Sequence, residues 1–566
     1  MKKYIKIISL SLVLFTSCSD VLDKEPLALI ADSNIWQDES LLNAYLNRMY
    51  LEAPFLNQTG QSGFNVGLIG AMGAEFRTMG PWQTPYKAAI AIINENGAPG
   101  AMNYWGYNSI RRANEFILRL NTESNLDQEI IDKKIAEARF LRAFYYFEMV
   151  KRYGGVPIIT VPQSIDEEDL FLERDTEEAV YDFIASEMDA IADSLSDTPN
   201  ASSGRASKWA ALALKSRAMT YAGSIGEFGT PVPGEYVGIS NANKYWQMAY
   251  DTSKEIIENS GHALFNKYAS DKTKNFQQLF LEENNSEVIF SEIFDETLLR
   301  THSFSGLTMP SGFEVVWGSN FPVFYDTVRL FDFADGSSGD LSESEITAQT
   351  WSSEELFGTR DARFKASIFY PEAAWQGSKV YFHSSSSGTL AEDWPAKAPN
   401  RNKNRTGFHL RKRLDESVPK PRGGLDGTDY IVFRLGEVYL NLAEAAFHLG
   451  KVGEATNAIN AIRSRAGMPA RTGLTWENII QERRCELFAE DHSYWDFRRW
   501  RIAVDVLDDL RTRGVRYAYN ADTKKYTITF VNGEGAKRVF KDRNYYFPVG
   551  PSILADNPDF KENPGY

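Results

Sequence analysis

The sequence predicts an all-α-dominated protein in which tetratricopeptide-like helical hairpins form an α-solenoid scaffold, with a large irregular, loop-rich region and little β-structure. Three observations predict this class. Paired segments with helical periodicity carry small residues that face aromatic ones. One late segment matches the core of a tetratricopeptide repeat, and the stretch over about residues 265–428 contains few periodic segments.

The first part of the scaffold is expected over about residues 34–260. Apolar residues that recur every three or four positions predict helices over 38–52, 104–120, 130–153, 175–195, 206–222 and 242–259. Gly154 and Pro157 follow the third of these segments and are typical of a helix end. Asp175 and Glu178 have the spacing of a capping box, which would start the fourth helix.

The second part of the scaffold is expected over about residues 429–510. Its predicted helix pairs are 432–449 with 454–466, and 476–490 with the segment that follows. The L-G-x-x-Y core of a tetratricopeptide repeat begins at Leu435, although His448 stands where the repeat would have alanine. Because a single hairpin of this kind cannot bury its own apolar face, several hairpins are expected to stack.

The N-terminus has the layout of a secretory signal. Three lysines precede an apolar run over residues 7–15, which is too short to cross a bilayer as a helix. Ser17 precedes Cys18 in a pattern similar to the lipobox of bacterial lipoproteins, although Phe15 stands where that motif usually has leucine. We therefore expect a signal peptide over residues 1–17 and a lipid, such as palmitate, on Cys18. An ordinary signal peptide that contains a cysteine by chance is the alternative.

The organisation that follows is a lipid-bearing tether over residues 18–33 and a single domain over residues 34–566. Removal of the signal peptide would take away three lysines and change the formal net charge from −15 to −18. Such an acidic chain argues against nucleic acid as a partner and against electrostatic docking on anionic lipid. The lipid on Cys18 would therefore have to hold the chain on a membrane.

Motifs for metal, cofactor or nucleotide chemistry are missing from the sequence. The six histidines are scattered, and no HExxH, EF-hand, GxSxG or Walker A pattern is present. Cys485 is the second of two cysteines, so a mature chain with a lipidated Cys18 could form no internal disulfide. Its helical context predicts a small buried side chain. The sequence thus predicts no metal site, no cofactor and no catalytic residues.

One block, RRCELFAEDHSYWDFRRW at residues 483–500, invites a catalytic interpretation because carboxylates and arginines alternate in it. Glycoside hydrolysis needs two carboxylates beside the sugar, one of them with a raised pKa. Here Glu482, Glu486, Glu490 and Asp496 all have arginines close in sequence, which would lower the pKa of each carboxyl group. We therefore expect a structural network of ion pairs rather than an active site.

Aromatic residues in non-helical segments are the better candidates for ligand binding. A flat ring can cover the apolar face of a sugar, while carboxylate, amide and guanidinium groups bind its hydroxyls. The candidates are Glu75, Arg77, Trp82 and Tyr86 in one segment, Trp317, Asn320 and Tyr325 in a second, and Trp375 in a third. The alternative for each aromatic residue is that it fixes a loop to the core.

Several blocks, taken in order, resemble the SusD/RagB family of nutrient-binding outer-membrane lipoproteins of Bacteroidetes. Besides Cys18 and the block at 483–500, they are ARFLRAFYYFEMVKRYGGVP (138–157), FYDTVRLFDFADG (324–336), RDARF (360–364), DYIVFRLGEVYLNLAEAA (429–446), AINAIRSRAG (458–467) and YYFPVGPSILADNPDFKENPGY (545–566). Ala362 departs from the family pattern, where many members have proline. The resemblance covers nearly the whole chain.

The resemblance implies a function that periodicity and spacing do not show. Members of the family bind glycans, or in some cases peptides, on the cell exterior and pass them to a SusC-like TonB-dependent transporter barrel in the outer membrane. They are not enzymes, and loops near Trp82 and Trp317 are where members contact ligand. The alternatives for this chain are a peptide-binding member of the family and a structural lid of the barrel without ligand selectivity.

Overall fold

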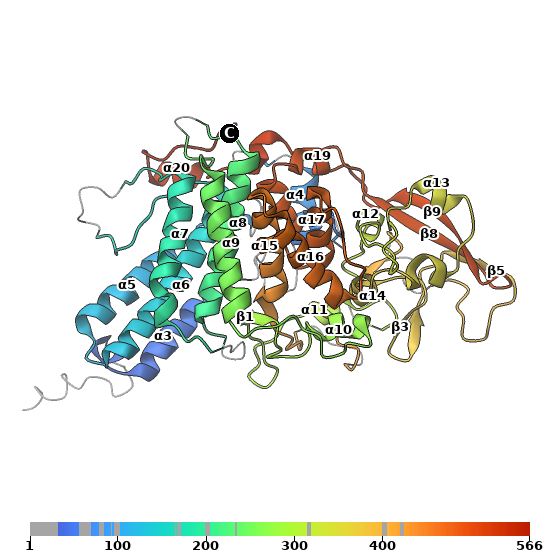
Figure 1. Ribbon diagram of the computed structural model, residues 1–566, viewed down its shortest axis with the longest axis horizontal. Coiled ribbons are helices and arrows are strands. Elements are labelled where there is room, and N and C mark those ends of the chain that lie inside the picture. Colours follow the sequence, from blue (N-terminus) through green and yellow to red (C-terminus); the bar gives the residue numbers. More distant parts are fainter. Residues whose placement is uncertain are drawn as a thin grey trace, which may run out of the picture.

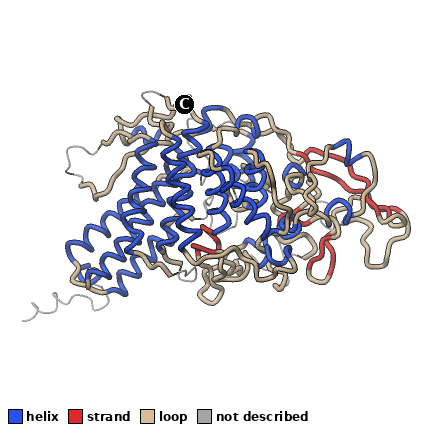
Figure 2. Tube along the Cα trace, viewed as in Figure 1, coloured by secondary structure: helices blue, strands red, loops and turns tan. Residues whose placement is uncertain are grey.

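A computed structural model describes residues 32–566 apart from 56–68, 79–83, 92, 95–101, 165, 167–170, 199–203, 233–234, 314–317, 399–404 and 419–423. Long helices make up one end and the middle of the elongated molecule, and short strands and irregular segments make up the other end (Figures 1 and 2). The predicted class, a helical-hairpin scaffold with an irregular region and little β-structure, is confirmed. The predicted signal peptide, Cys18 and nearly all of the tether lie outside the described residues.

The scaffold is a row of helices in which neighbours along the chain pack side by side. Its helices are α2 (Asp32–Ile35), α3 (Glu39–Glu52), η1 (Ile69–Ala71), α4 (Thr84–Ile90), α5 (Tyr107–Glu123), α6 (Gln128–Tyr153), α7 (Glu177–Ile191), η3 (Ala192–Ser194), α8 (Lys208–Phe228), α9 (Ala242–Asn259), α15 (Leu435–His448), α16 (Val452–Ala466) and α17 (Trp476–Glu486). The packing order runs from α5 through α6, α7, α8 and α9 to α15 and α16, so the two parts of the scaffold that are distant in sequence join where α9 meets α15.

Local sequence explains where most of these helices begin and end. Asp38 caps α3 by accepting hydrogen bonds from the backbone of the first turn. Gly154 ends α6 with a φ of 74°, a conformation that costs glycine little. The predicted capping box at Asp175 and Glu178 is wrong: Thr176 caps α7 instead, with its hydroxyl accepting from Ala179 N. The Asp175 carboxylate does not cap α7, because it accepts a hydrogen bond from Ile158 N at 2.7 Å instead.

The late hairpin α15–α16 forms as the repeat pattern predicts. His448 does not disrupt it, because the imidazole ring stacks on Trp246 of α9 with the ring centroids 4.6 Å apart and the planes within 8°. The residue that departs from the repeat pattern therefore contributes to packing between α9 and α15.

The irregular region and the C-terminal segment contain short elements. Their helices are α10 (Lys272–Gln278), α11 (Phe304–Thr308), α12 (Tyr325–Val328), α13 (Glu343–Thr347), η5 (Glu354–Gly358), α14 (Ala362–Ser367), α18 (Ser493–Arg499), α19 (Ala503–Leu507), η7 (Asp542–Tyr545) and α20 (Pro551–Asp556). Their strands are β1 (Val288–Glu292), β2 (Ile368–Phe369), β3 (Ala373–Trp375), β4 (Ser378–Val380), β5 (Ser385–Ser387), β6 (His409–Leu410), β7 (Tyr430–Arg434), β8 (Arg513–Asn520) and β9 (Lys525–Asn532).

These strands form four small sheets rather than one. β1 pairs with β7, β2 with β6 and β3 with β4, all antiparallel, while β5 runs parallel to β8 beside the β8–β9 hairpin. The β1–β7 pair joins the irregular region to the strand that leads directly into α15. Because each sheet is small, side-chain packing against the helices must stabilise them.

A single large core cluster extends through the scaffold and the irregular region, with a smaller cluster around α10. Cys485 is buried in the large cluster, as predicted, and its thiol donates to Leu330 O. Burial raises the pKa of this thiol well above its usual value. Among the described residues, no helix is both long enough and apolar enough to span a membrane.

Candidate ligand-binding site

The two loop segments that hold most of the predicted ligand-binding residues lie side by side. Phe76 and Val323 form an isolated antiparallel bridge. The backbone N–H of Arg77 donates to Pro322 O at 2.9 Å, and that of Phe324 donates to Glu75 O at 3.2 Å. Segments about 250 residues apart in sequence are therefore joined by main-chain hydrogen bonds, which sequence patterns alone could not establish.

Several of the predicted residues are buried, and burial keeps their side chains from contacting a ligand in this structure. Trp375 is fully buried, packs edge-on against Phe369, and directs its Nε1 toward Met309 Sδ at 3.1 Å. Tyr325 is also buried, and its hydroxyl donates to Leu341 O at 2.8 Å. The expectation that these rings stack on a sugar is not supported, because each ring fixes a loop to the core instead.

Glu75 and Asn320 are polar candidates that are buried as well. The Glu75 carboxylate accepts hydrogen bonds from Ser493 Oγ at 2.5 Å and from Ala489 N at 3.2 Å. Burial nevertheless outweighs these bonds and raises the pKa of Glu75 to about 7. Asn320 has a buried side-chain oxygen without a hydrogen-bond partner among the described residues. Neither side chain is exposed to a ligand in this conformation.

Arg77 and Tyr86 lie closer to the surface of the same segment. Arg77 is 8% exposed, and its guanidinium donates from Nη1 to Gly533 O at 3.1 Å. Burial lowers the pKa of Arg77. Tyr86 is half-buried on α4. Trp82 and Trp317, the two strongest aromatic candidates, lie outside the described residues, so their role stays a prediction.

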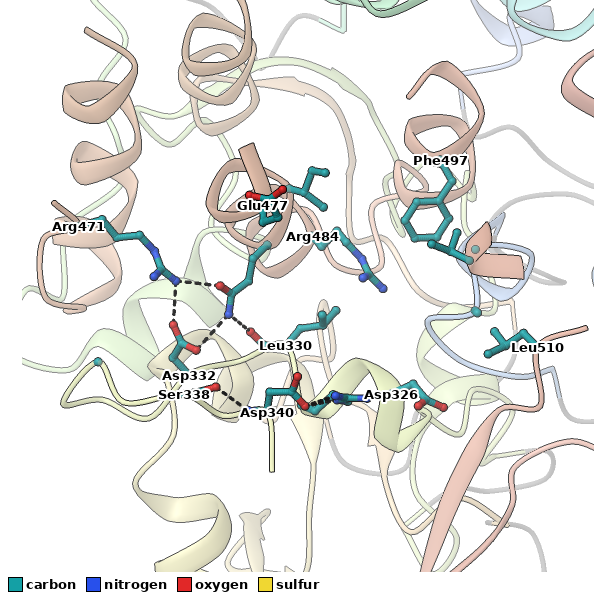
Figure 3. Close-up of a pocket in the computed structure, with 17 residues that line it drawn as sticks. Asp326, Leu330, Asp332, Ser338, Asp340, Arg471, Glu477, Arg484, Phe497 and Leu510 are labelled. Atoms are coloured by element: carbon teal, nitrogen blue, oxygen red, sulfur yellow. Dashed lines mark hydrogen bonds and ion pairs between the residues drawn. The ribbon is translucent and has the colours of Figure 1, made fainter. Parts of the chain in front are cut away.

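A pocket of about 610 Å³ is lined in part by Gly73 and Ala74, which directly precede Glu75 in the sequence. Its walls come from α12, the loop that follows α12, the helices α17, α18 and α19, and Leu510 (Figure 3). The volume is within the range of about 300–1,000 Å³ that is usual for small-ligand sites. The helical scaffold and the irregular region thus meet at a cavity that could hold a ligand.

Hydrogen bonds and ion pairs hold one wall of the pocket. Arg471 donates to Asp332 at 2.9 Å and to Gln481 Oε1 at 2.8 Å, and Gln481 in turn donates to Asp332 at 3.0 Å and to Leu330 O at 2.8 Å (Figure 3). Arg329 forms an ion pair with Asp340. These contacts neutralise two acidic groups of the pocket and fix the loop against α17.

The remaining pocket carboxylate near α12 is also neutralised. Asp326 accepts two hydrogen bonds of 2.7 Å from Arg513, one from the backbone N–H and one from Nε. Arg484 differs from the other pocket arginines, because no hydrogen bond or ion pair joins it to any residue within the described ranges, and its Nε is buried without a partner. The Arg484 guanidinium instead lies over the Phe497 ring, 5.0 Å from its centroid. Burial lowers the pKa of Arg484, while the charge of Glu75 opposes that shift.

The pocket residues were missed at the sequence level. Arg484 lies in the block at 483–500, where carboxylates and arginines alternate in the sequence. A count of charges along the block cannot show which arginine points away from the carboxylates. The spacing of Arg484 and Glu477, seven residues apart, predicts that they share one face of α17, but only the structure shows that this face lines the pocket.

Four carboxylates, Glu482 next to that block and three within it, form the expected network. Glu482, Glu486, Glu490 and Asp496 are buried and ion-paired with Arg363, Lys412, Arg434, Arg463, Arg465, Arg483 and Arg499. Asp491, also in the block, has no ion pair among the described residues: it accepts a hydrogen bond from Gly70 N, and burial raises its pKa to about 6. Burial of Glu490 disfavours its charge, but Arg434 and Lys412 outweigh burial and lower its pKa to about 2. A carboxyl group with such a pKa cannot serve as a general acid near neutral pH. The interpretation of this block as a structural network is confirmed.

Among the described residues, no group of three or more histidine, cysteine, aspartate or glutamate side chains is arranged to hold a metal ion. The fold and the pocket together define a binding-protein architecture, in which a rigid row of helices supports an irregular region and a cavity forms between them.

Comparison with known proteins identifies the family. The model of the SusD family matches residues 286–566, and a second model, described as starch-binding and associating with the outer membrane, matches residues 71–219. The SusD-like protein P25 of Formosa agariphila is 25% identical over 88% of this chain and 89% of its own length. The starch-binding protein SusD of Bacteroides thetaiotaomicron is 23% identical over 79% of this chain and 75% of its own length.

Solved structures agree with this result at the level of the fold. A SusD-like protein of Bacteroides fragilis superposes with a TM-score of 0.76 over 96% of this chain and 100% of its own, at 24% identity. A laminarin-binding SusD-like protein superposes with a TM-score of 0.63 over 94% of this chain and 100% of its own, at 21% identity. The chain belongs to the SusD/RagB family.

Proposed function

We propose that this chain is a cell-surface lipoprotein that binds an oligosaccharide and passes it to a SusC-like TonB-dependent transporter barrel in the outer membrane. The observation that carries the proposal is its family membership over most of its length, with relatives whose names describe binding of starch and laminarin. The lipid on Cys18 would hold the chain on the outer face of the outer membrane.

The structure supports a binding role rather than a catalytic one. Glu486, Glu490 and Asp496 of the block at 483–500, and Glu482 beside it, are committed to buried ion pairs. Binding would therefore proceed without a covalent step, through stacking and hydrogen bonds to sugar hydroxyls. Because every hydroxyl must lose bound water first, the affinity for each sugar unit should be modest.

The test is binding of the full chain to a broad glycan panel, followed by calorimetry on the glycans that bind. We expect saturable binding to one polysaccharide class and no release of reducing ends during prolonged incubation. Binding to peptides alone would move the chain to the peptide-binding branch of the family, and turnover of any glycan would contradict the proposal.

Trp82 and Trp317 test where the oligosaccharide binds. Replacement of both with alanine should weaken glycan binding by about tenfold or more if the rings stack on sugar. Trp375→Ala is unsuited as a control because that ring is buried. Trp105→Ala is the control, because Trp105 is half-buried and its ring packs against Tyr153 and Phe560. Unchanged binding in the double variant would favour the structural lid that does not select a ligand.

A partner barrel is tested by co-purification. The full chain, expressed with a SusC-like transporter of the same organism, should co-elute with that transporter from detergent extracts. Separate elution of the two proteins would leave glycan binding intact as a function but would remove the transfer step.

A further inference from the structure

The pocket of Figure 3 contains a positive charge that the protein itself does not neutralise. Arg329 and Arg471 are ion-paired with Asp340 and Asp332, whereas Arg484 makes no ion pair or hydrogen bond in the described part of the chain. Of the three guanidinium nitrogens, Nε is buried without an acceptor among the described residues, and it loses hydration without recovering it. Such a group costs stability unless something else binds it, which makes it a feature that folding does not explain.

The geometry prepares Arg484 to bind an acceptor from outside. The Phe497 ring lies against the guanidinium, with Cζ 5.0 Å from the ring centroid, and Figure 3 shows the Arg484 side chain directed away from α17 into the pocket. An arginine whose face is covered presents its N–H groups at the edge, where they can bind a carboxylate or a sulfate through two parallel hydrogen bonds. The residue is half-buried, so an acceptor would bind in a partly desolvated place where the interaction is stronger than in water.

The acidic side chains of the pocket do not oppose an incoming anion. Asp326, Asp332 and Asp340 are each neutralised by an arginine partner. Glu75, whose charge attracts Arg484, is held by Ser493 and Ala489, and burial keeps its carboxyl group partly protonated near neutral pH. Glu477 is exposed at the other end of α17, two helical turns or about 10 Å away, where solvent and salt screen its charge.

We propose that this pocket binds the anionic substituent of an acidic sugar, a carboxylate or a sulfate, with the Arg484 guanidinium as its partner. The inference rests on the proposed function, because it names the class of oligosaccharide: one that carries negative charge. Among the described residues, the lining of the pocket comes from Gly73 and Ala74, the helices α12, α17, α18 and α19, and the loop after α12.

The test uses the full chain, purified in detergent, and monosaccharides as probes. Saturation-transfer NMR titrations would compare glucuronate and galacturonate with glucose and galactose, and glucose 6-sulfate with glucose. Sodium acetate and sodium sulfate serve as anions without a sugar. We expect at least one of the two charged classes to bind about tenfold or more tightly than its neutral counterpart, which is the effect of one charge-assisted contact.

Three variants assign that preference to Arg484. Arg484→Gln should abolish the preference for charged sugars without lowering the melting temperature, because no ion pair is lost. Arg484→Lys keeps the charge but not the two parallel donors, and should leave a weaker preference. Arg111→Gln removes the same charge from an exposed pair on α5 and should leave the preference unchanged.

Two results would overturn the inference. One is binding of charged sugars by Arg484→Gln as tightly as by the unaltered chain. The other is binding of acetate or sulfate as tightly as the sugars, which would show a site for small anions only. Failure of this inference is separable from failure of the proposed function: a chain that binds neutral oligosaccharides with no contribution from Arg484 loses only the inference, and one that binds no glycan loses both.

Discussion

At the scale of single residues, the stability of this protein depends on buried charges that have partners. Arg434 joins three carboxylates, with its Nη1 at 2.8 Å from Glu287 and 2.6 Å from Glu486 and its Nε at 2.7 Å from Glu490. All four side chains are buried. The removal of one member leaves charges that neither water nor a counter-ion can stabilise.

Arg434→Leu should therefore lower the free energy of unfolding by about 3–5 kcal/mol. Arg111→Leu is the control, because Arg111 pairs with Glu115 on the exposed face of α5, where such a pair contributes about 0.5 kcal/mol or less. Urea denaturation measures both. A loss of less than 1 kcal/mol in the Arg434 variant would show that water enters the network and compensates for the missing guanidinium.

As the pH rises, ionisation of Glu75 should lower the free energy of unfolding, whereas ionisation of a carboxylate in the network should raise it. The pKa of Glu75 is raised from 4.5 to about 7 by burial, so the folded state binds the proton more tightly than the unfolded state does. The stabilising effect of this proton is complete below pH 4.5 and is lost as the pH rises through 7.

Glu75→Gln should remove that loss, because the amide stays neutral at every pH. Relative to the unaltered chain, the variant should gain about 2–3 kcal/mol in the free energy of unfolding between pH 5 and pH 8. Denaturation of both proteins at the two pH values measures the difference. An equal effect of the substitution at pH 5 and pH 8 would mean that Glu75 is ionised throughout.

At the scale of elements, close approach of helices makes one glycine indispensable. Gly223 lies in α8 where that helix packs against Trp246 of α9, and a Cβ at this position would come within 2.6 Å of the indole ring. His448 stacks on the same indole, so the ring is held by α15 as well. Helix propensity alone would favour alanine at position 223 by about 1 kcal/mol, but packing opposes it.

Gly223→Ala should destabilise the protein by about 1–3 kcal/mol through this overlap. Gly453→Ala is the matched control on α16, because a Cβ there would meet no atom within 4 Å and should stabilise by up to about 1 kcal/mol. Thermal or chemical denaturation measures whether each substitution lowers or raises the free energy of unfolding. Stabilisation by both substitutions would show that α8 and α9 can separate at low cost.

The β8–β9 hairpin is an element that was not predicted, although its sequence contains a signal. Val515, Tyr517 and Tyr519 alternate with less buried residues, and Tyr526 and Ile528 do so on the partner strand. This period of two is typical of a half-buried strand. The alternating segments are short, so the pattern alone is weak evidence for a strand.

At the scale of the whole molecule, lipid anchoring through Cys18 is a prediction that substitution can test. The described residues contain no helix suited to cross a bilayer, and Cys18 lies outside them. A lipid on Cys18, if present, would supply an attachment to the membrane.

Cys18→Ser should transfer the protein from the detergent phase to the aqueous phase in a detergent-partition experiment, because its N-terminus could no longer be acylated. Cys485→Ser leaves the N-terminal cysteine in place and should partition like the unaltered chain. Mass spectrometry of the N-terminal peptide checks for the lipid directly. Retention of the Cys18 variant in the detergent phase would contradict lipid anchoring through this residue.

The sequence by itself determined the helical-hairpin class, most helix boundaries and the structural role of the block at 483–500, because these depend on local periodicity, caps and charge spacing. α9 begins and ends where the pattern predicts, at Ala242 and Asn259. The tertiary structure decided which residues are accessible. Trp375 and Tyr325 looked like exposed aromatic residues in loops, but long-range packing buries both.

The pocket is a second feature that tertiary structure decides and local sequence does not. Arg484 was visible in the sequence as one arginine among many, yet its lack of a partner depends on the positions of α12, α17 and α18 relative to one another. Such positions result from contacts between residues that are far apart along the chain, which no local pattern encodes. Accessibility and pairing of charges are tertiary properties, and they decide where a ligand can bind.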